Sequence, residues 1–258
     1  MTVSGQLDGR VAIVTGAGRG LGAAIATLFG AEGATVVVSD IDAEAAEKVA
    51  AGIPGATAQR CDVRDEAEVR TLVEDTVARH GALHVMVPNA GVGDALPLLH
   101  MDLAAWRAVT SVNLDGVFLS IRYAAPAIIA AGGGTIVTIA SVTALTGSPL
   151  IGHYAAAKAG VLNLTKTAAT ELRPHGVRVN AVMPGFVGTE MVQHAKPNFE
   201  KFLEVPAGTF DALITQKQGR YGEPDEVARA ALFLAGEQSS WCHGTGLVLD
   251  GGLTSSLI

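Results

Sequence analysis

The sequence predicts an α/β fold in which helices cover both faces of a doubly wound, mostly parallel sheet. Short apolar runs rich in β-branched residues alternate along the chain with longer segments of helical pattern, an order typical of parallel sheets. The expected strands are continuously apolar, as strands are when both faces of a sheet are covered. No internal repeat, low-complexity stretch or Ser/Pro-rich linker divides the 258 residues, so we expect a single domain over residues 1–258.

The elements follow one another in a regular order. Buried strands are expected at Val11–Thr15, Thr35–Ser39, Leu83–Val87, Thr135–Ile139, Val177–Ala181 and Leu247–Leu249. Helices are expected at Gly20–Ala31, Ala43–Ala51, Glu66–Arg79, Leu103–Ala131 and Tyr154–Arg173. The segment 189–218 has no strand pattern and carries Pro197, Pro206 and scattered aromatic residues. We interpret it as a lid over an active site rather than as a helical excursion on the surface, because such segments often close active sites.

The net charge of the chain limits the kinds of molecule that we expect it to bind. The formal net charge is −7, whereas binding to a nucleic acid or to an anionic membrane surface normally relies on a dense field of Lys and Arg. We therefore expect neither as a partner. An anionic small molecule remains allowed, because the N-terminus of a helix can bind phosphate through backbone N–H groups.

The sequence also indicates where the protein is located and whether its cysteines form a disulfide or a metal site. No apolar run is expected to reach the roughly 18 to 20 residues of a membrane span, and Met1 to Arg10 lacks the pattern of a signal peptide. We expect a cytoplasmic protein. The two cysteines, Cys61 and Cys242, are far apart and in no Cys/His cluster, so we expect two core residues and neither a disulfide nor a metal site.

A glycine-rich turn follows the first expected strand directly. Its pattern, T-G-x-x-x-G-x-G, runs from Thr15 to Gly22 and leads into an alanine-rich helix. Glycines allow a tight turn and let backbone N–H groups approach a pyrophosphate, whose charge suits the positive end of the helix. Such a turn can also serve only tight packing of strand and helix. The strand before it and the helix after it favour a dinucleotide site in a Rossmann-like fold.

The second expected strand leads into an acidic residue, Asp40, which lies 20 residues after Gly20. A carboxylate there can accept hydrogen bonds from the hydroxyls of the adenosine ribose, whereas it would repel a 2′-phosphate. We therefore expect NAD as the cofactor and hold NADP to be less favoured. Asp40 could instead cap the next helix, but Asp42 is better placed for that role. Arg19, within the glycine-rich turn, is a contrary signal because it could reach a 2′-phosphate.

Tyr154 and Lys158 lie four residues apart near the start of an expected helix, so both side chains project from one face. The unperturbed pKa of tyrosine is near ~10, and a nearby cation can lower it by roughly 1 to 3 units. We expect Lys158 to supply that charge, so that Tyr154 donates a proton in reduction and accepts one in oxidation. A purely structural pair on a solvated helix face is the alternative.

Two further polar residues favour the catalytic interpretation. Ser141 stands thirteen residues before Tyr154 and just past the strand Thr135–Ile139, at the same mouth of the sheet as the glycine-rich turn. Its hydroxyl could orient or polarise a substrate carbonyl. Asn113 is a polar amide inside a long apolar helix, and it is either a satisfied kink or the support of a water that leads to Lys158.

Together these motifs resemble the short-chain dehydrogenase/reductase family, and the resemblance covers essentially all 258 residues. The motifs keep the family's order and spacing: Thr15 to Gly22, Asp62-Val63, Asn89-Ala90-Gly91, Asn113, Ser141, Tyr154 with Lys158, and Pro184-Gly185 with Thr189. The resemblance implies a catalytic tetrad of Asn113, Ser141, Tyr154 and Lys158, in which Lys158 also bonds the nicotinamide ribose. Pro88 departs from the family's pattern, which often has an asparagine there, and this affects the rigidity of the loop.

The resemblance also implies where the cofactor lies. Asp62 and Val63 correspond to the pair that flanks the adenine ring, Asn89 and Gly91 to the turn that supports the ribose and the central sheet, and Thr189 to a contact at the nicotinamide end. The expected cofactor-binding residues are Gly16, Arg19, Gly20, Leu21, Asp40, Ile41, Asp62, Val63, Asn89, Ala90, Gly91, Tyr154, Lys158, Pro184, Gly185, Val187 and Thr189. A homotetramer is implied too, with candidate interfaces on the helices Leu103–Ala131 and Tyr154–Arg173 and near the final stretch Leu247–Gly252.

The function expected from these residues is hydride transfer between NAD and a secondary alcohol or ketone, with NAD preference leaning towards oxidation. An NADPH-dependent 3-oxoacyl carrier-protein reductase is an alternative that Asp40 disfavours. A non-catalytic nucleotide-binding regulatory protein is another, but it would have no chemical need for Ser141, Tyr154 and Lys158 together. Sugar-nucleotide epimerase or dehydratase chemistry would need a longer chain with a separate substrate domain.

The sequence around these residues suggests an apolar substrate of modest size. The residues expected to surround it are Val142, Thr143, Leu145, Leu150, His153, Met191, Phe199, Phe202 and Phe210. Hydrophobic pockets discriminate poorly among similar molecules, so the identity of the substrate stays open. His153 could bind the substrate, but a packed or solvated histidine is the more common case.

Overall fold

The computed structural model describes residues 5–255 and contains one sheet of parallel strands in the order β3-β2-β1-β4-β5-β6-β7. The strands are β1 (Val11–Thr15), β2 (Thr35–Asp40), β3 (Thr57–Arg60), β4 (Val85–Val87), β5 (Gly134–Ile139), β6 (Val177–Pro184) and β7 (Gly246–Leu249). The strand order reverses between β1 and β4, which is where ligands bind in open α/β sheets. The predicted doubly wound parallel sheet is confirmed. Residues 1–4 and 256–258 of the expected domain lie outside the described residues.

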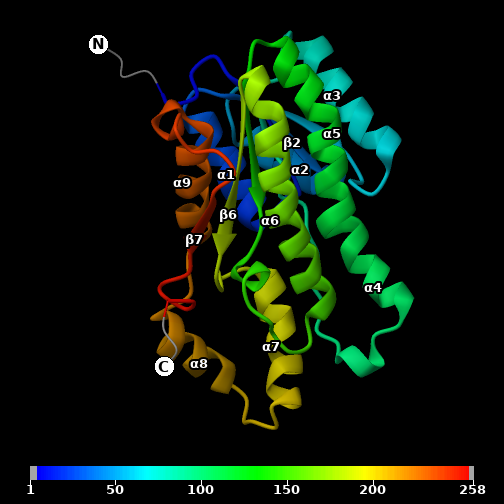
Figure 1. The fold of residues 1–258 in the computed structure, drawn as a ribbon, viewed down its shortest axis with the longest axis vertical. Helices are drawn as coiled ribbons and strands as arrows, with labels where there is room; N and C mark the ends of the chain where they lie inside the picture. The colour runs from blue at the N-terminus through cyan, green and yellow to red at the C-terminus, as the bar shows by residue number, and fades with distance from the viewer. Residues whose placement is uncertain (1–4, 256–258) are drawn as a thin grey trace.

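Helices cover both faces of the sheet (Figure 1). One face carries α1 (Gly20–Ala31), α2 (Ala43–Ala51) and α9 (Pro224–Ala235), and the other carries α3 (Glu66–His80), α4 (Leu103–Thr110), α5 (Gly116–Ala130) and α6 (Gly152–Leu172). Side chains of a strand alternate between these two layers: Val14 packs in the cluster of α1 and α9, and its neighbour Ile13 packs in the cluster of α3 and α5. Because both layers are apolar, the central strands are apolar at every position.

The two edge strands differ from what the sequence predicts. Leu247–Leu249 was expected to be buried, but β7 is only partly buried and Val248 is 38% exposed, because an edge strand has a neighbour on one side only. The opposite edge, β3, was not expected at all, since its residues Thr57–Arg60 are largely polar. Helix α9 was also missed, although Pro224 at its start and the acidic residues of its first turn are helix signals.

The expected helix Leu103–Ala131 forms, with a change of geometry in its middle. A π-helical turn, η2 (Ser111–Asp115), joins α4 to α5 and contains Asn113. By length and composition alone the helix Leu103–Ala130 could cross a membrane, but Arg107, Asp115 and Arg122 interrupt it, so it contains no continuous apolar run of the length expected for a span. Half of its most apolar window is buried inside the protein.

The segment 189–218, which we call the lid segment, is helical in this structure. It forms α7 (Glu190–Phe202) and α8 (Thr209–Gln218), which lie beyond the end of β6 at the foot of Figure 1. Phe199 and Phe210 pack together with Ile214 in a small apolar cluster of their own. Short 3₁₀ helices complete the chain at η1 (Leu98–His100), η3 (Val142–Ala144), η4 (Arg173–His175) and η5 (Glu237–Ser239).

Candidate active site

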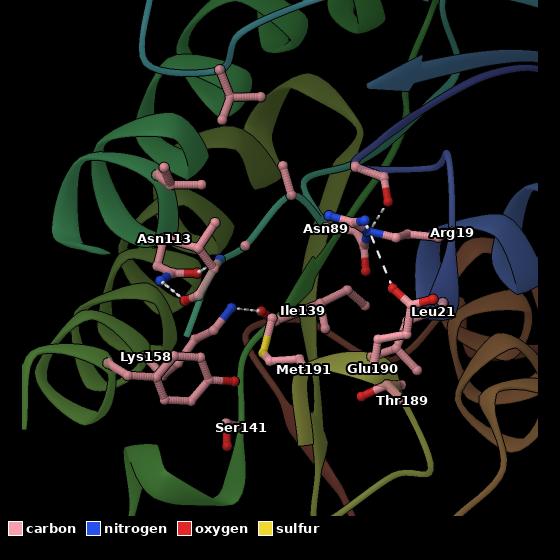
Figure 2. A pocket seen from close by; sticks show the side chains of 18 of the residues that line it. Arg19, Leu21, Asn89, Asn113, Ile139, Ser141, Lys158, Thr189, Glu190 and Met191 are labelled. Carbon is pink, nitrogen blue, oxygen red and sulfur yellow. Dashed lines mark hydrogen bonds and ion pairs between the residues drawn. The ribbon is translucent and has the colours of Figure 1, made fainter. Parts of the chain in front are cut away.

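A pocket of about 610 Å³ opens at the carboxyl ends of the strands. Every residue that the sequence singled out for catalysis or for cofactor binding lines this pocket. Figure 2 shows Arg19 and Leu21 at one side of it and Lys158 and Ser141 at the other. The fold therefore brings together residues from the whole length of the chain at the predicted place.

Other lining residues were not expected from the sequence. They are Cys61, Arg64, Val92, Ala108, Val112, Ile139, Ala140, Gly188, Glu190 and Val192, whereas Met191, which also lines the pocket, was expected beside the substrate. Several are direct neighbours of predicted residues, a signal that could have found them. Cys61 is a buried core residue as predicted, and burial raises the pKa of its thiol to about 12, which keeps it protonated and unreactive. Cys242 is half-buried and packs against the core.

The glycine-rich turn serves both packing and binding. A Cβ atom on Gly22 would lie 2.3 Å from the carbonyl oxygen of Gly16, so Gly22 is required for close packing. Gly20 has a φ of +56° and faces the pocket, and the nearest atom to an added Cβ is 4.0 Å away. No side chain caps the N-terminus of α1, so its first N–H groups are left for an anion. These features fit the pyrophosphate of a dinucleotide.

Asn89 joins the loop after β4 to this turn. Its Nδ2 donates hydrogen bonds to the carbonyl oxygens of Thr15 and Gly16 at 2.9 and 3.0 Å. In return, Thr15 Oγ1 accepts the backbone N–H groups of Asn89 and Ala90 at 3.1 and 3.2 Å. The two loops are thereby fixed to one another on either side of the point where the strand order reverses.

Asp40 lies at the end of β2 and lines the pocket. Its carboxylate accepts the N–H of Gly18 at 2.9 Å and the N–H of Asp42 at 3.0 Å. An ionised carboxylate offers about four acceptor positions, so acceptor capacity remains for a ligand. Asp42 caps α2 by accepting the N–H of Ala45, as the sequence predicted.

Two arginines line the pocket, and both are paired with carboxylates. Arg19 forms an ion pair with Glu190 of α7 at 3.7 Å, which Figure 2 marks with a dashed line. Arg64 binds Asp62 through two nitrogens, with a shortest distance of 2.6 Å, and this hydrogen bonding lowers the pKa of Asp62. Neither guanidinium is an uncompensated positive charge in this structure.

Lys158 is buried, with 3% of its surface exposed, and its Nζ donates a hydrogen bond to the carbonyl oxygen of Ile139 at 2.7 Å. The same nitrogen lies 5.6 Å from the centroid of the Tyr154 ring. Burial lowers the pKa of Lys158 to about 8, because desolvation disfavours the charged ammonium. Lys158 is therefore poised to change its protonation state close to neutral pH.

The pKa of Tyr154 moves in the direction opposite to the one predicted. Burial raises it above the ordinary value, because desolvation disfavours the phenolate, and a hydrogen bond with Ser141 acts in the lowering direction. The expectation that Lys158 lowers this pKa was thus wrong for the protein chain by itself. Lys158 is held by the carbonyl of Ile139 and does not lower the pKa of Tyr154, so the lowering effect comes from Ser141.

Asn113 is fully buried in the π-helical turn, and its amide is satisfied by backbone groups. Its Nδ2 donates to the carbonyl oxygens of Val92 and Val109 at 2.6 and 3.1 Å, and its Oδ1 accepts the N–H of Val92 at 3.1 Å. The sequence allowed two interpretations of Asn113. The side chain matches the first of them, a kink in the helix whose polar amide is satisfied by backbone hydrogen bonds. It ties η2 to the loop after Asn89-Ala90-Gly91.

A residue of the lid segment holds the chain in place at the end of β6, next to Pro184 and Gly185. Gln218, at the end of α8, accepts the N–H of Phe186 at 2.8 Å and donates to its carbonyl oxygen at 2.7 Å. Gln218 is 6% exposed, so these bonds are shielded from water. This residue was not expected from the sequence, because its contacts depend on how α8 packs.

A smaller cavity of about 110 Å³ adjoins the large pocket. Ser141, Tyr154, Gly185, Met191 and Val192 line both spaces. The remaining walls of the cavity are Gly93, Asp94, Val142, Thr143, Ile151, Phe186, Ala195, Phe199 and Phe210. We call this space the substrate cavity, since it is mostly apolar and touches the predicted catalytic residues.

The walls of the substrate cavity match the sequence expectation in part. Val142, Thr143, Met191, Phe199 and Phe210 line it as predicted. The other four expected residues do not line it: Leu145 and Phe202 are 55% and 48% exposed, and Leu150 and His153 are buried in neighbouring packing. The side chain of His153 accepts the backbone N–H of Tyr154 at 2.9 Å, which makes it a packed histidine.

Within residues 5–255, no group of His, Cys, Asp and Glu side chains is arranged to hold a metal ion. Ser141, Tyr154 and Lys158 are side chains of the large pocket that can take part in proton transfer.

Known proteins resemble this chain over nearly its whole length. A family model described as Enoyl-(Acyl carrier protein) reductase matches residues 16–254. A cyclohexanol dehydrogenase from Acinetobacter sp. (strain SE19) is 39% identical, and the match covers 98% of this chain and 98% of that protein. A 3-oxoacyl-(acyl-carrier-protein) reductase from Thermotoga maritima is 40% identical over 96% of this chain and 99% of its own length.

Solved structures agree with the sequence relatives. The crystal structure of levodione reductase superimposes with a TM-score of 0.91 at 34% identity, covering 97% of this chain and 99% of the other. The motifs, the sheet and these relatives lead to one conclusion: the chain belongs to the short-chain dehydrogenase/reductase family, whose members are oxidoreductases that use a nicotinamide cofactor, NAD or NADP.

Proposed function

We propose that this oxidoreductase transfers hydride between NAD and a secondary alcohol or its ketone, with Tyr154 as the residue that moves the proton. The observation that carries the proposal is that Ser141 and Tyr154 line both the dinucleotide pocket and the substrate cavity. A substrate oxygen bound there lies beside a hydroxyl pair and next to a cofactor in the larger pocket.

The choice of NAD over NADP rests on charge. Asp40 places a carboxylate where the adenosine ribose is expected, and a 2′-phosphate would meet it as a like charge. The two arginines that could compensate are already paired, Arg19 with Glu190 and Arg64 with Asp62. The Arg19–Glu190 pair is exposed on both sides, so Arg19 stays the contrary signal to this choice.

The catalytic roles follow from the geometry of three side chains. The bound cofactor supplies the hydride acceptor or donor. Ser141, which is buried and lines both spaces with Tyr154, binds the substrate oxygen, and Tyr154 donates or accepts the proton at that oxygen. Lys158, whose Nζ is fixed by the carbonyl of Ile139 beside the Tyr154 ring, would bond the nicotinamide ribose. Asn113 holds the loop at Val92 that forms part of the pocket wall.

The substrate that suits this site is a single-ring, alicyclic secondary alcohol. An engineered apolar cavity of roughly 150 Å³ binds benzene, so the cavity of about 110 Å³ is close to the size of one small ring. One relative is named a cyclohexanol dehydrogenase, after a single-ring secondary alcohol, which supports this choice. The lid segment closes the cavity with Met191, Phe199 and Phe210 and acts as the substrate lid.

We also propose a cytoplasmic homotetramer. Exposed apolar residues lie on the elements that family resemblance implies as interfaces: Phe118 of α5 is 50% exposed and Val248 of β7 is 38% exposed. Burial of such residues between subunits would remove apolar surface from water. Sedimentation velocity or light scattering on the purified protein tests this state, and a monomer would contradict it.

The test of the function is a pair of measurements on one preparation. Titration with NADH and with NADPH, followed by nicotinamide fluorescence, is expected to show tighter binding of NADH. Oxidation of cyclohexanol with NAD is then expected to be detectable. Preference for NADPH with reduction of 3-oxoacyl thioesters would instead establish the 3-oxoacyl carrier-protein reductase, the activity named for the relative from Thermotoga maritima. Tight cofactor binding without turnover of either class would favour a regulatory protein.

A further inference from the structure

The substrate cavity carries one charged side chain on its otherwise uncharged wall. Asp94, in the loop after β4, is the sole residue with a full charge among the described residues that line this cavity. The rest of the lining consists of glycine, aliphatic, aromatic, methionine and hydroxyl-bearing residues. Asp94 was not expected from the sequence to touch the substrate.

The carboxylate of Asp94 binds a backbone group and no cationic side chain among the described residues. Its Oδ1 accepts the N–H of Ala95 at 2.7 Å, and the residue is exposed. Among residues 5–255, the ion pairs involve other carboxylates, and no Lys or Arg pairs with Asp94.

Two side chains that could neutralise Asp94, His153 and Lys196, are either uncharged or already paired with another residue. His153 faces Asp94, but it is buried and desolvation lowers its pKa, so its ring is neutral at neutral pH. Lys196 of α7, next to the cavity residue Ala195, is bound to Asp211 at 2.6 Å. The negative charge of Asp94 therefore acts on whatever occupies the cavity.

We propose that Asp94 determines charge specificity: it makes the site reject substrates that carry a carboxylate and admit uncharged ring alcohols. This inference rests on the proposed function and narrows its substrate class. A carboxylate bound in a cavity of about 110 Å³ cannot be far from a charged residue of the wall, and apolar walls screen the repulsion less than water does. A cationic group on the substrate would be attracted by the same charge.

The experiment compares three ring alcohols that differ at the carbon opposite the hydroxyl: 4-methylcyclohexanol, 4-hydroxycyclohexanecarboxylate and 4-aminocyclohexanol. For the unmodified enzyme with NAD, kcat/KM for the carboxylate is expected to be at least about tenfold below that for the methyl compound. The variant Asp94→Asn keeps the size and the acceptor for the Ala95 N–H, and it removes the charge. In this variant, kcat/KM relative to the methyl compound should rise about tenfold for the carboxylate and fall for the amine.

Opposite changes for the anion and the cation separate an electrostatic role from a merely structural one, because a disturbed cavity would lower both. The charge effect should also shrink as salt is added, since Asp94 is exposed. Glu204→Gln is the matched control: it removes one exposed negative charge from the lid segment at a residue that lines neither space, and it should leave the ratios unchanged.

Failure of this inference is distinguishable from failure of the proposed function. If the methyl compound is oxidised but the carboxylate is oxidised equally well, or Asp94→Asn leaves the ratios unchanged, the charge specificity is wrong and the activity stands. If no compound turns over, the activity is wrong, and the dissociation constants of the three compounds for the NADH complex then measure the charge effect directly. Equal binding of anion and neutral compound in that assay overturns the role of Asp94.

Discussion

Lys158 and Tyr154 lie one helical turn apart on α6, and the ammonium nitrogen of Lys158 is 5.6 Å from the centroid of the Tyr154 ring. That nitrogen is held by the carbonyl of Ile139 at 2.7 Å, so its position is set by β5 as well as by its own helix. Burial acts on both groups: it raises the pKa of Tyr154 and lowers that of Lys158 to about 8. Burial therefore disfavours charge on either residue, whereas Ser141 and the charge of a bound oxidised nicotinamide would favour the phenolate.

Replacement of the phenol hydroxyl tests the role of Tyr154. Tyr154→Phe should lower kcat by roughly 10² to 10⁴, the contribution typical of a positioned proton-transfer group. Binding of NADH, followed by its fluorescence, should change little because the ring and its packing are kept. Activity close to that of the unmodified enzyme would refute the assignment. Tyr123→Phe, which removes an exposed hydroxyl bonded to Glu66, is the control.

The pH dependence of stability reports on the buried ammonium of Lys158. Its folded pKa of about 8 lies below its ordinary value of 10.5, so between these pH values the unfolded chain binds more protons than the folded one. The free energy of unfolding should therefore rise with pH across this window, and the full penalty should be present below pH 8. Relative to Lys158→Met, the gain should be roughly 2 to 3 kcal/mol. Urea unfolding of both proteins from pH 7 to about pH 10 measures it, and a constant difference between them would contradict the shift.

Cofactor choice should depend on the charge of Asp40. Asp40→Asn keeps the size and one acceptor, so the N–H of Gly18 or of Asp42 can still be bound. Loss of the like charge should improve NADPH binding relative to NADH by about tenfold. Asp42→Asn removes the same charge two residues away, outside the pocket lining, and should leave the ratio nearly constant. An unchanged ratio in Asp40→Asn would assign the choice to Arg19 or Arg64.

Asn113 should matter for stability through the loop it holds. Asn113→Ala removes two part-buried hydrogen bonds to Val92 and a buried one to Val109, and each such bond contributes about 0.5 to 1.5 kcal/mol. A loss of roughly 2 to 4 kcal/mol in the free energy of unfolding is therefore expected. Ser120→Ala, which removes a buried hydroxyl bonded to Gly116 within α5, is expected to cost less. Equal, small losses for both variants would show that the Asn113 bonds contribute little.

Much of the fold could be predicted from local patterns. The apolar runs placed six strands, and the glycine-rich turn and the spacing of Tyr154 and Lys158 placed residues that do line one pocket. These signals are readable because they are short-range: strand alternation, helix spacing and the needs of a tight turn act between residues a few positions apart. The polar edge strand Thr57–Arg60 carries no such pattern, because it forms only by pairing with β2.

The sequence by itself determined the sheet apart from its polar edge strand β3, the family, and the catalytic and cofactor-binding residues predicted to line the pocket. Only the tertiary structure decided that Arg19 is paired with Glu190, that Asn113 binds Val92, and that burial raises rather than lowers the pKa of Tyr154. It also placed Asp94 on the substrate cavity. The physical reason is that hydrogen-bond partners, desolvation and charge all depend on which distant segments meet, and no periodicity in the chain encodes that.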